Sequence, residues 1–364
     1  MNRHAFVRAH AQVREAPPLR PRPHDPGPSQ EFHCWPLPGY VWPALERRYH
    51  SIFCSEPLLR LHDALTPHIE AWVARRDGRI TAVILFERTW RCVRVINEVF
   101  DLPAETLDEF ADAVFAQYPA LTAIRLRAVA LEGRTRKYPC LATTSSDDYL
   151  LSLPATEDAW LASLSAQTRE KIRYHWRRTQ RRQPGLVFRT VRAEAIDMAQ
   201  LRSVIAFNRA RMQAKGRRFG MSEDDERRLC ALMRERGLLS VIEIDGEIRA
   251  GLLCTLAGDD ITMHVIAHDP AFDDLRLGFL CCVMTIQEAI AQGLQRFHFL
   301  WGHYDYKTRL GGRRIDLSQV LLMRARGFAL LHPRLVGAQC IAGLRAALRA
   351  IARRYRQRFA ATRR

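Results

Sequence analysis

The chain has 364 residues, more than a single hydrophobic core usually contains, so two domains are expected. Hydrophobic residues make up 48%, enough for sizeable cores, and no apolar run approaches the roughly 20 residues needed to span a bilayer, which argues against an integral membrane protein. The formal net charge of +17 favours anionic partners and disfavours cationic ones.

The first part of the chain predicts a disordered arm followed by an α/β domain. Residues 1–36 are rich in proline, arginine and histidine without a periodic pattern, which is typical of disorder. From 37 to 155, strand-like and helix-like patterns alternate, and Asp77-Gly78 separates two apolar runs as in a β-hairpin. The expected elements are strands over 69–75, 80–87, 92–99, 123–129 and 149–153 and a helix over 104–117.

The second domain is expected over 156–330. A long basic helix is predicted over 157–182 with Thr156 as its N-cap, and a later helix is capped by Ser222. Asp245-Gly246 predicts a second hairpin. The other expected elements are strands over 186–191, 238–244, 248–256, 261–267, 296–300 and 316–323 and helices over 194–215 and 279–292.

Residues 331–364 predict a basic amphipathic C-terminal helix. This segment carries nine arginines and no acidic residue, and from Leu344 on apolar residues recur every three or four positions. Such a helix suits an anionic membrane, so peripheral contact with the inner membrane face is one expectation. The alternative is that the apolar stripe packs on the second domain. The nine cysteines lack disulfide or metal-ligand spacing and no N-terminal signal region is visible, so a cytoplasmic protein without metal is expected.

The segment 296–312, RFHFLWGHYDYKTRLGG, holds the densest group of chemically active residues. A short strand with alternating aromatic residues ends at Gly302. The next seven residues include His303, Tyr304, Asp305, Tyr306, Lys307 and Arg309. Because α/β proteins place polar side chains at strand ends, a functional site is predicted here.

A second motif precedes it, formed by Trp160, Leu164-Ser165, Arg169, Ile172-Arg173 and Arg177-Arg178. Together with the strand, glycine-containing loop, helix and strand that lead into 296–312, this motif resembles the Gcn5-related N-acetyltransferase (GNAT) superfamily. More narrowly, the two motifs are similar to the branch found near cellulose and exopolysaccharide genes and related to Fem-type peptidyltransferases. The resemblance covers roughly residues 149–324.

The resemblance implies a mixed α/β fold of tandem acetyltransferase-like domains, the first degenerate and the second holding the active site. It implies transfer of an acyl group from acetyl-CoA or another acyl-CoA to an amine or hydroxyl, on a polysaccharide, cell-envelope or lipid-linked acceptor. Two alternatives stay open: an aminoacyl transferase of Fem type, and a non-catalytic accessory protein whose basic faces bind anionic polymer or membrane. Sequence-specific DNA binding is not expected, since no recognised nucleic-acid module is visible.

The acyl-CoA site is expected at the start of the helix that follows strand 261–267. Unpaired N–H groups at a helix N-terminus bind pyrophosphate, and glycine lets the backbone approach closely. An ordinary strand-to-helix turn is the alternative, because the loop has a single glycine and Asp273-Asp274 brings negative charge. The expected donor-site residues are Val265, Ala267, Arg276, Leu277, Gly278 and Phe279, the first two lying where a backbone N–H would stabilise the oxyanion.

Acyl transfer needs a base for the nucleophile, an acid for the leaving thiolate and a group that stabilises the oxyanion. The resemblance places Lys307 at the anionic substrate or oxyanion and makes Tyr304 or Tyr306 the acid. Four histidines crowd two neighbouring strands and their ends, His264, His268, His298 and His303. We select His303, which lies in the polar cluster, and His268, which ends the strand that should border the donor. Packing or solvated surface roles are the alternatives.

The helix predicted over 157–182 also carries a possible acceptor site. Arg169, Arg173 and Arg177 recur at i, i+4 spacing and therefore share one face. This face is either a cationic wall for an anionic acceptor or a solvated helix surface.

Overall fold

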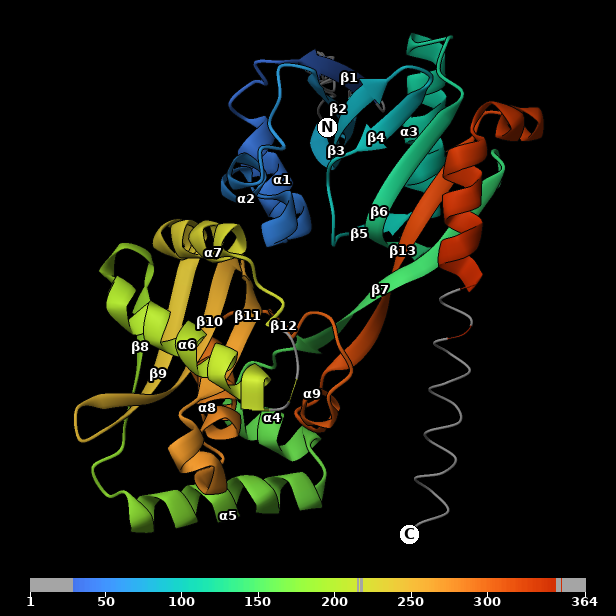
Figure 1. The fold of residues 1–364 in the computed structure, drawn as a ribbon. Coiled ribbons are helices and arrows are strands. Elements are labelled where there is room, and N and C mark those ends of the chain that lie inside the picture. The colour runs from blue at the N-terminus through green and yellow to red at the C-terminus, as the bar shows by residue number, and fades with distance from the viewer. Residues whose placement is uncertain (1–28, 215, 217–218, 345–347, 349–364) are drawn as a thin grey trace, which may run out of the picture.

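The computed structural model describes residues 29–214, 216, 219–344 and 348, which form two halves joined by two long strands (Figure 1). Each half is a mixed α/β unit with its own buried apolar cluster. The expected class, central mixed sheets flanked by helices, is confirmed. In this part of the chain no helix is long and apolar enough to cross a membrane.

The first half is built on an apolar sheet. Its elements are β1 (Ser29–Cys34), α1 (Val41–Tyr49), the 3₁₀ turn η1 (Ile52–Cys54), α2 (Glu56–Leu61), β2 (Ile69–Arg76), β3 (Arg79–Thr89), β4 (Cys92–Val95), β5 (Asp101–Pro103), α3 (Ala104–Gln117) and β6 (Ala123–Glu132). The hairpin predicted at Asp77-Gly78 joins β2 to β3, and both turn residues have positive φ. Trp72 of β2 packs against Phe110 of α3 in the core of this half.

The prediction of a disordered arm over 1–36 is wrong at its end, where β1 is a strand. Ser29–Cys34 pairs antiparallel with β2, and Phe32 packs against the first core. A polar segment can form a strand here because β2 would otherwise present an unpaired edge. Residues 1–28 of the predicted arm lie outside the described residues.

The second half has helices on both faces of its sheet. Its elements are α4 (Glu157–Ser163), α5 (Ala166–Arg182), β8 (Val187–Arg192), the 3₁₀ turn η2 (Ala193–Ala195), α6 (Met198–Ala214), α7 (Glu223–Arg236), β9 (Gly237–Ile244), β10 (Glu247–Ala257), β11 (Asp260–His268), the 3₁₀ turn η3 (Pro270–Leu275), α8 (Leu277–Ala291), β12 (Arg296–His298) and α9 (Asp305–Arg309). α6 and α7 cover one face around Val204 and Met233, and α8, with α4 and α5, covers the other around Leu280 (Figure 1).

The single helix expected over 157–182 is wrong, because the chain breaks between α4 and α5 at Leu164-Ser165. Ser165 has extended backbone and its side chain accepts a hydrogen bond from the Thr168 N–H, which starts a new helix. The cap predicted at Ser222 is confirmed as a full capping box with Asp225.

Two long strands, β7 (Cys140–Ser152) and β13 (Arg313–Met323), connect the halves. They pair antiparallel with each other, while β13 also pairs with β6 and β7 with β12. One sheet therefore runs in the order β1-β2-β3-β4-β6-β13-β7-β12-β11-β10-β9-β8, with β5 beside β6. The predicted second domain, 156–330, thus includes a strand whose residues Val320 and Leu322 complete the core of the first half.

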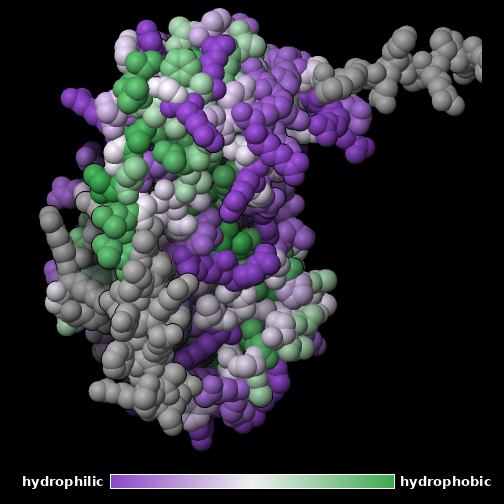
Figure 2. All heavy atoms as spheres, turned by 90° about the vertical axis from the view of Figure 1, so that its right-hand side faces the viewer, coloured by the Kyte–Doolittle hydropathy of each residue, from purple (hydrophilic) through white to green (hydrophobic). Residues whose placement is uncertain are grey.

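After β13, the 3₁₀ turn η4 (Arg326–Leu331) and a helix over 333–344 return along the sheet. Gln339 is buried and donates hydrogen bonds to the carbonyls of Leu141 and Gln319, at 3.0 and 2.6 Å. These bonds hold the beginning of the expected C-terminal helix on β7 and β13. Ile341 and Leu344 stay exposed, and Figure 2 shows hydrophobic side chains gathered in a band on this face. Leu348 of the predicted apolar stripe is exposed too, and the stripe residues after it lie outside the described residues.

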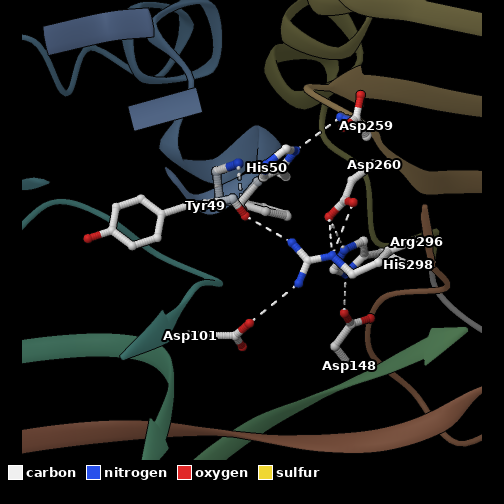
Figure 3. A network of polar contacts seen from close by, with 10 residues as sticks. Tyr49, His50, Asp101, Asp148, Asp259, Asp260, Arg296 and His298 are labelled. Atoms are coloured by element: carbon white, nitrogen blue, oxygen red, sulfur yellow. Dashed lines mark hydrogen bonds and ion pairs between the residues drawn. The ribbon is translucent and has the colours of Figure 1, made fainter. Parts of the chain in front are cut away.

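A buried charged network marks the junction of β7, β11 and β12 (Figure 3). His298 lies between two carboxylates, with Nδ1 2.5 Å from Asp148 Oδ2 and Nε2 2.9 Å from Asp260 Oδ2. Arg296 donates to the same Asp260 oxygen at 2.8 Å. Because both carboxylates are almost fully buried, they depend on His298 and Arg296 for charge compensation.

The first half also contacts this network. The Arg296 guanidinium donates to the Tyr49 carbonyl at 3.2 Å and lies 3.4 Å from Asp101. Burial disfavours the charged form of His298, but the hydrogen bonds to Asp148 and Asp260 outweigh it and raise the pKa of His298 to about 9. A protonated His298 therefore holds the junction at neutral pH.

We predict that stability falls as the pH rises from about 6.5 to about 9. The folded-state pKa of His298 is raised above its ordinary value of 6.5. Its stabilising charge is therefore fully present below about 6.5 and is lost as the pH passes through about 9. The expected loss is on the order of 2–3 kcal/mol, measured by denaturant unfolding across this range.

Two variants separate the contribution of His298 to the pH dependence of stability from general effects of pH. His298→Gln should flatten the dependence, whereas His68→Gln, at an exposed position, should preserve it. If His298→Gln keeps the slope of the wild type, the junction is not the titrating element.

Candidate active site

Two neighbouring strands separate at the centre of the second half. β11 and β12 are parallel and pair over three positions only, from Asp260 to Thr262 on β11. β11 then continues to His268, while the chain after β12 turns away through Leu300 and Gly302, which both have positive φ. In the described part of the chain no strand pairs with the second part of β11 on this side, so its edge faces a wedge-shaped opening.

β11 carries a bulge beside this opening. Leu253 of β10 lies opposite Val265, but the next residue, Cys254, lies opposite Met263, so His264 is the extra residue of β11. A bulge increases the local twist and redirects a side chain. Here the redirected side chain is an imidazole.

A cavity of about 670 Å³ occupies the wedge and extends between the two halves. Its walls come from β11, residues 299–307, α6 and α7, and from η1 and α2 of the first half. A volume of this order accommodates a small organic ligand. Four residues expected at the active site line it together, Val265, Tyr304, Tyr306 and Lys307.

His264 lines the cavity and is neutral. Its Nε2 lies 2.8 Å from Oγ1 of the buried Thr255. Burial lowers the pKa of His264 to about 4, so the imidazole is unprotonated at neutral pH. In the tautomer whose Nε2–H donates to Thr255, Nδ1 keeps a lone pair that can accept a proton.

Lys307 is buried beneath the segment that follows β12. The residue is 2% exposed, and Nζ donates hydrogen bonds to the carbonyls of Leu300 and Trp301 at 2.9 and 2.8 Å. Burial lowers the pKa of Lys307 to about 8, against the opposing influence of Asp148 and Asp147. The alternative of a solvated lysine is therefore wrong, and Lys307 holds the backbone that forms one wall of the cavity.

The two tyrosines differ in exposure. Tyr306 packs edge-on against Phe299, with ring centroids 6.2 Å apart, and burial raises the pKa of its hydroxyl. Tyr304 is 47% exposed, and its ring centroid lies 5.5 Å from Lys307 Nζ. Tyr306 therefore suits packing, whereas the hydroxyl of Tyr304 is accessible to a ligand.

His303 and His268 lie outside the lining of this cavity. His303 is half exposed, and its Nδ1 lies 2.7 Å from the Tyr149 hydroxyl. His268 ends β11 with its Nε2 3.1 Å from Asp273 Oδ1. The fold thus separates these three histidines, leaving His264 in the cavity and His268 at the end of β11.

α8 begins without a side-chain cap. Its N-cap residue, Arg276, has left-handed backbone with φ 57° and ψ 37°, and no side-chain hydrogen bond caps the first turn, 277–279. A Cβ placed on Gly278 would lie 3.0 Å from His268 Nδ1 and 3.8 Å from Ile266 Cγ1. Because Ile266 lines the cavity, the start of α8 and the cavity share a wall.

Cationic side chains gather around the start of α8. The imidazole of His175, on α5, lies edge-on to Phe279 with ring centroids 6.1 Å apart. Burial lowers the pKa of His175, and the charges of Arg276, Arg178 and Lys171 lower it further. The buried His175 Nδ1 has no hydrogen-bond partner within the described ranges. This combination of uncapped helix start and cations suits a phosphate group.

The acidic pair Asp273-Asp274 is compensated by basic side chains. Arg178 and Arg182 of α5 both contact Asp274. Asp273 lies 3.1 Å from His268 and 3.9 Å from Arg276. The negative charge expected to oppose an anion at α8 is therefore partly neutralised.

The three arginines expected as an acceptor wall lie outside the cavity lining. Arg169 donates to the carbonyls of Leu161 and Ala162 at 3.5 and 3.3 Å, which caps the end of α4. Arg173 lies 3.5 Å from Glu170, and Arg177 is exposed. Arg169 therefore has a structural partner.

The sequence did not single out Arg211 or His175. Arg211 of α6 lines the cavity, and its buried Nε has no hydrogen-bond partner among the residues that the structure describes. Their helix-like sequence context carries no signal that distinguishes them from surface arginines and histidines. No cluster of three or more His, Cys, Asp or Glu side chains suited to a metal ion occurs in the described residues.

We predict that Lys307→Met destabilises the protein by roughly 2–3 kcal/mol, because it leaves the carbonyls of Leu300 and Trp301 without their charged donor. Denaturant unfolding measures the loss, and hydrogen exchange should show faster opening of residues 299–307. Lys137→Met, which alters an exposed surface ion pair, is the matched control and should leave stability close to that of the wild type. Wild-type stability and exchange in Lys307→Met would contradict this role.

Residues 166–308 match a family model described as Acetyltransferase (GNAT) domain. A comparison with curated protein sequences finds no match. Among solved structures, FemX is 12% identical with a TM-score of 0.58, over 82% of this chain and 99% of that one. The C-terminal domain of a putative lysylphosphatidylglycerol synthetase from Agrobacterium fabrum is 13% identical with a TM-score of 0.48, over 81% and 93%. The L-PGS of Bacillus licheniformis is also 13% identical with a TM-score of 0.47, over 86% and 98%.

These likenesses concern fold. The similarity to FemX covers both halves of this chain, whereas the family model covers the segment that contains β11, α8, β12 and most of α9. The segment 166–308 thus carries the signature of a GNAT domain, and the chain has a GNAT-like α/β fold.

Proposed function

We propose that this protein is an acyltransferase that moves an acyl group from acyl-CoA to an amine or hydroxyl of an acceptor held between its halves. The observation that carries the proposal is that the uncapped, cation-rich start of α8 and the cavity meet at Ile266. The first feature suits the phosphates of the donor, and the second suits the reacting groups.

The donor would lie along the open edge of β11. The backbone N–H groups of 277–279, with Arg276 and Lys171 nearby, would bind its phosphates. The amide-containing arm of the donor would pair with the unpaired backbone of β11 in the manner of an added strand. Its thioester would then reach the bulge at His264.

Each chemical step has a residue in reach of the cavity. The acceptor nitrogen or oxygen attacks the thioester carbonyl carbon, His264 Nδ1 accepts the proton released, and a C–N or C–O bond replaces the C–S bond. A backbone N–H in the stretch from Val265 to Ala267 would stabilise the oxyanion. The Tyr304 hydroxyl would donate a proton to the leaving thiolate and recover it from solvent. Lys307 would hold the wall that carries Tyr304.

Other readings of the sequence stay as alternatives. Aminoacyl transfer of the Fem type would use the same fold with another donor, and an accessory protein would bind anionic polymer without catalysis. A cytoplasmic location, a polysaccharide acceptor and peripheral membrane contact stay predictions. The exposed Ile341 and Leu344 and the net charge of +17 support the last of these.

We predict that Gly278→Glu abolishes acetyl-CoA binding. The new side chain would crowd His268, which lies 3.0 Å from a Cβ at this position, and would repel phosphates at the helix start. Calorimetric titration with acetyl-CoA measures the loss. Gly327→Glu, at an open position, is the control and should bind normally. Binding by Gly278→Glu would exclude this donor site, and failure of the wild type to bind acetyl-CoA would favour the alternatives.

We also predict that His264→Gln lowers kcat by about 10²–10⁴ without weakening acetyl-CoA binding, because it removes the proton acceptor. His303→Gln, which changes a histidine outside the cavity lining, should cost far less. Since the pKa of His264 is about 4, the wild type should keep its activity on acidification to about pH 5. Equal losses in the two variants, or an acidic limb near pH 6.5, would exclude His264 as the base.

A further inference from the structure

The charge of the cavity restricts its ligand. Among the described lining residues, Arg211 and Arg228 carry fixed positive charge, Lys307 is positively charged below its pKa of about 8, and Asp225 is the one acidic side chain. Asp225 is held in the capping box of α7, where its Oδ2 accepts hydrogen bonds from the hydroxyl and the backbone N–H of Ser222 at 2.7 and 3.1 Å. A cationic acceptor such as a polyamine would therefore enter a site of its own sign.

The walls of the cavity are mostly apolar. Leu58 of α2 and Phe53 of η1 line it from the first half and belong to one apolar cluster with Leu232 of α7, and Phe219 and Met221 add further apolar surface. The hydrogen-bonding groups that a saccharide needs around its ring are sparse there. Burying the aliphatic or aromatic part of a ligand against such walls stabilises the bound state.

Arg211 supplies a directed anion-binding group. Its NH2 donates to Asn208 Oδ1 at 3.1 Å, while its Nε is buried and has no partner in the described structure. Its charge lowers the pKa of the Tyr306 hydroxyl, against the larger effect of burial, so the guanidinium lies close to the catalytic end of the cavity. A guanidinium with a buried and unpaired Nε is well matched to a carboxylate or phosphate oxygen.

We infer that the acyl acceptor is a small molecule with an apolar body and one anionic group, such as an apolar amino acid or hydroxy acid, whose anion pairs with Arg211. This inference rests on the proposed function and specifies its acceptor. The anion fixes one end of the acceptor, and the apolar walls fix the body. The free amine or hydroxyl is then directed to the thioester carbonyl, loses its proton to His264 and forms the new bond as the C–S bond breaks.

Calorimetric titration of the full chain, with unreactive CoA present and absent, tests the acceptor class. The probes are phenylalanine and 3-phenyllactate, the carboxamides of both acids, which lack the carboxylate, and spermidine and glucosamine as cationic or hydrophilic compounds. We expect the two acids to bind at least about 10-fold more tightly than their amides, because each amide lacks the charge that pairs with Arg211. Acetyl transfer to the same probes from acetyl-CoA, followed by mass spectrometry, should show the same order.

Variants of α6 test whether the preference for acids over amides depends on Arg211. Arg211→Met should weaken binding of phenylalanine by about 10- to 100-fold and leave phenylalaninamide unchanged. Arg211→Lys should restore part of the affinity, since it keeps the charge without the planar fork. Arg202→Met, at an exposed position of the same helix, is the control and should behave as the wild type. Circular dichroism and CoA affinity report whether each variant is folded.

The outcomes separate the inference from the function on which it rests. Equal binding of acid and amide, tighter binding of spermidine or glucosamine, or no binding of either acid while CoA binds normally would overturn the acceptor class. An unchanged acid preference in a folded Arg211→Met variant would overturn the role of Arg211. Absence of CoA binding would instead count against the proposed donor.

Discussion

The early end of the pairing between β11 and β12 is the constraint on which the rest of the site depends. Three paired positions hold the two strands together, and beyond Thr262 and His298 each strand follows its own path. A sheet with complete pairing would have filled this space with backbone hydrogen bonds and left no cavity. The bulge at His264 lies just after the last paired residue of β11, where the opening begins. The same local distortion therefore exposes both a strand edge and an imidazole.

The pairing ends where the charged junction begins, and this explains why the wedge keeps its shape. His298 and Arg296 compensate the buried Asp148 and Asp260, which fixes the closed end of the wedge. A few residues later, Lys307 binds the two carbonyls that follow the strand and fixes the open end. Residues 296–307 thus form first part of the junction between the halves and then one wall of the cavity. A buried charge that is satisfied in this way specifies one geometry at the cost of desolvation.

Much of the local structure was predictable. The hairpins at Asp77-Gly78 and Asp245-Gly246, the helix over 104–117 and the cap at Ser222 follow from residues whose backbone and side-chain preferences act within a few positions. The break at Leu164-Ser165 was missed because helix-forming residues on both sides masked a serine cap. The share of β13 in the first core was missed because strand pairing across the chain leaves no local pattern.

The sequence by itself determined that a polar and aromatic cluster follows a buried strand near the C-terminal end, since strand periodicity and residue type are local properties. It also predicted this helix from 279 on, two residues after its observed start at Leu277, because Gly278 and the preceding Arg276 lie close together in the chain. Only the tertiary structure decided which histidine lines the cavity, because the bulge in β11 depends on its register with β10. It alone decided that Lys307 is buried and that Arg211 borders the cavity, since burial and the resulting pKa depend on neighbours from distant segments.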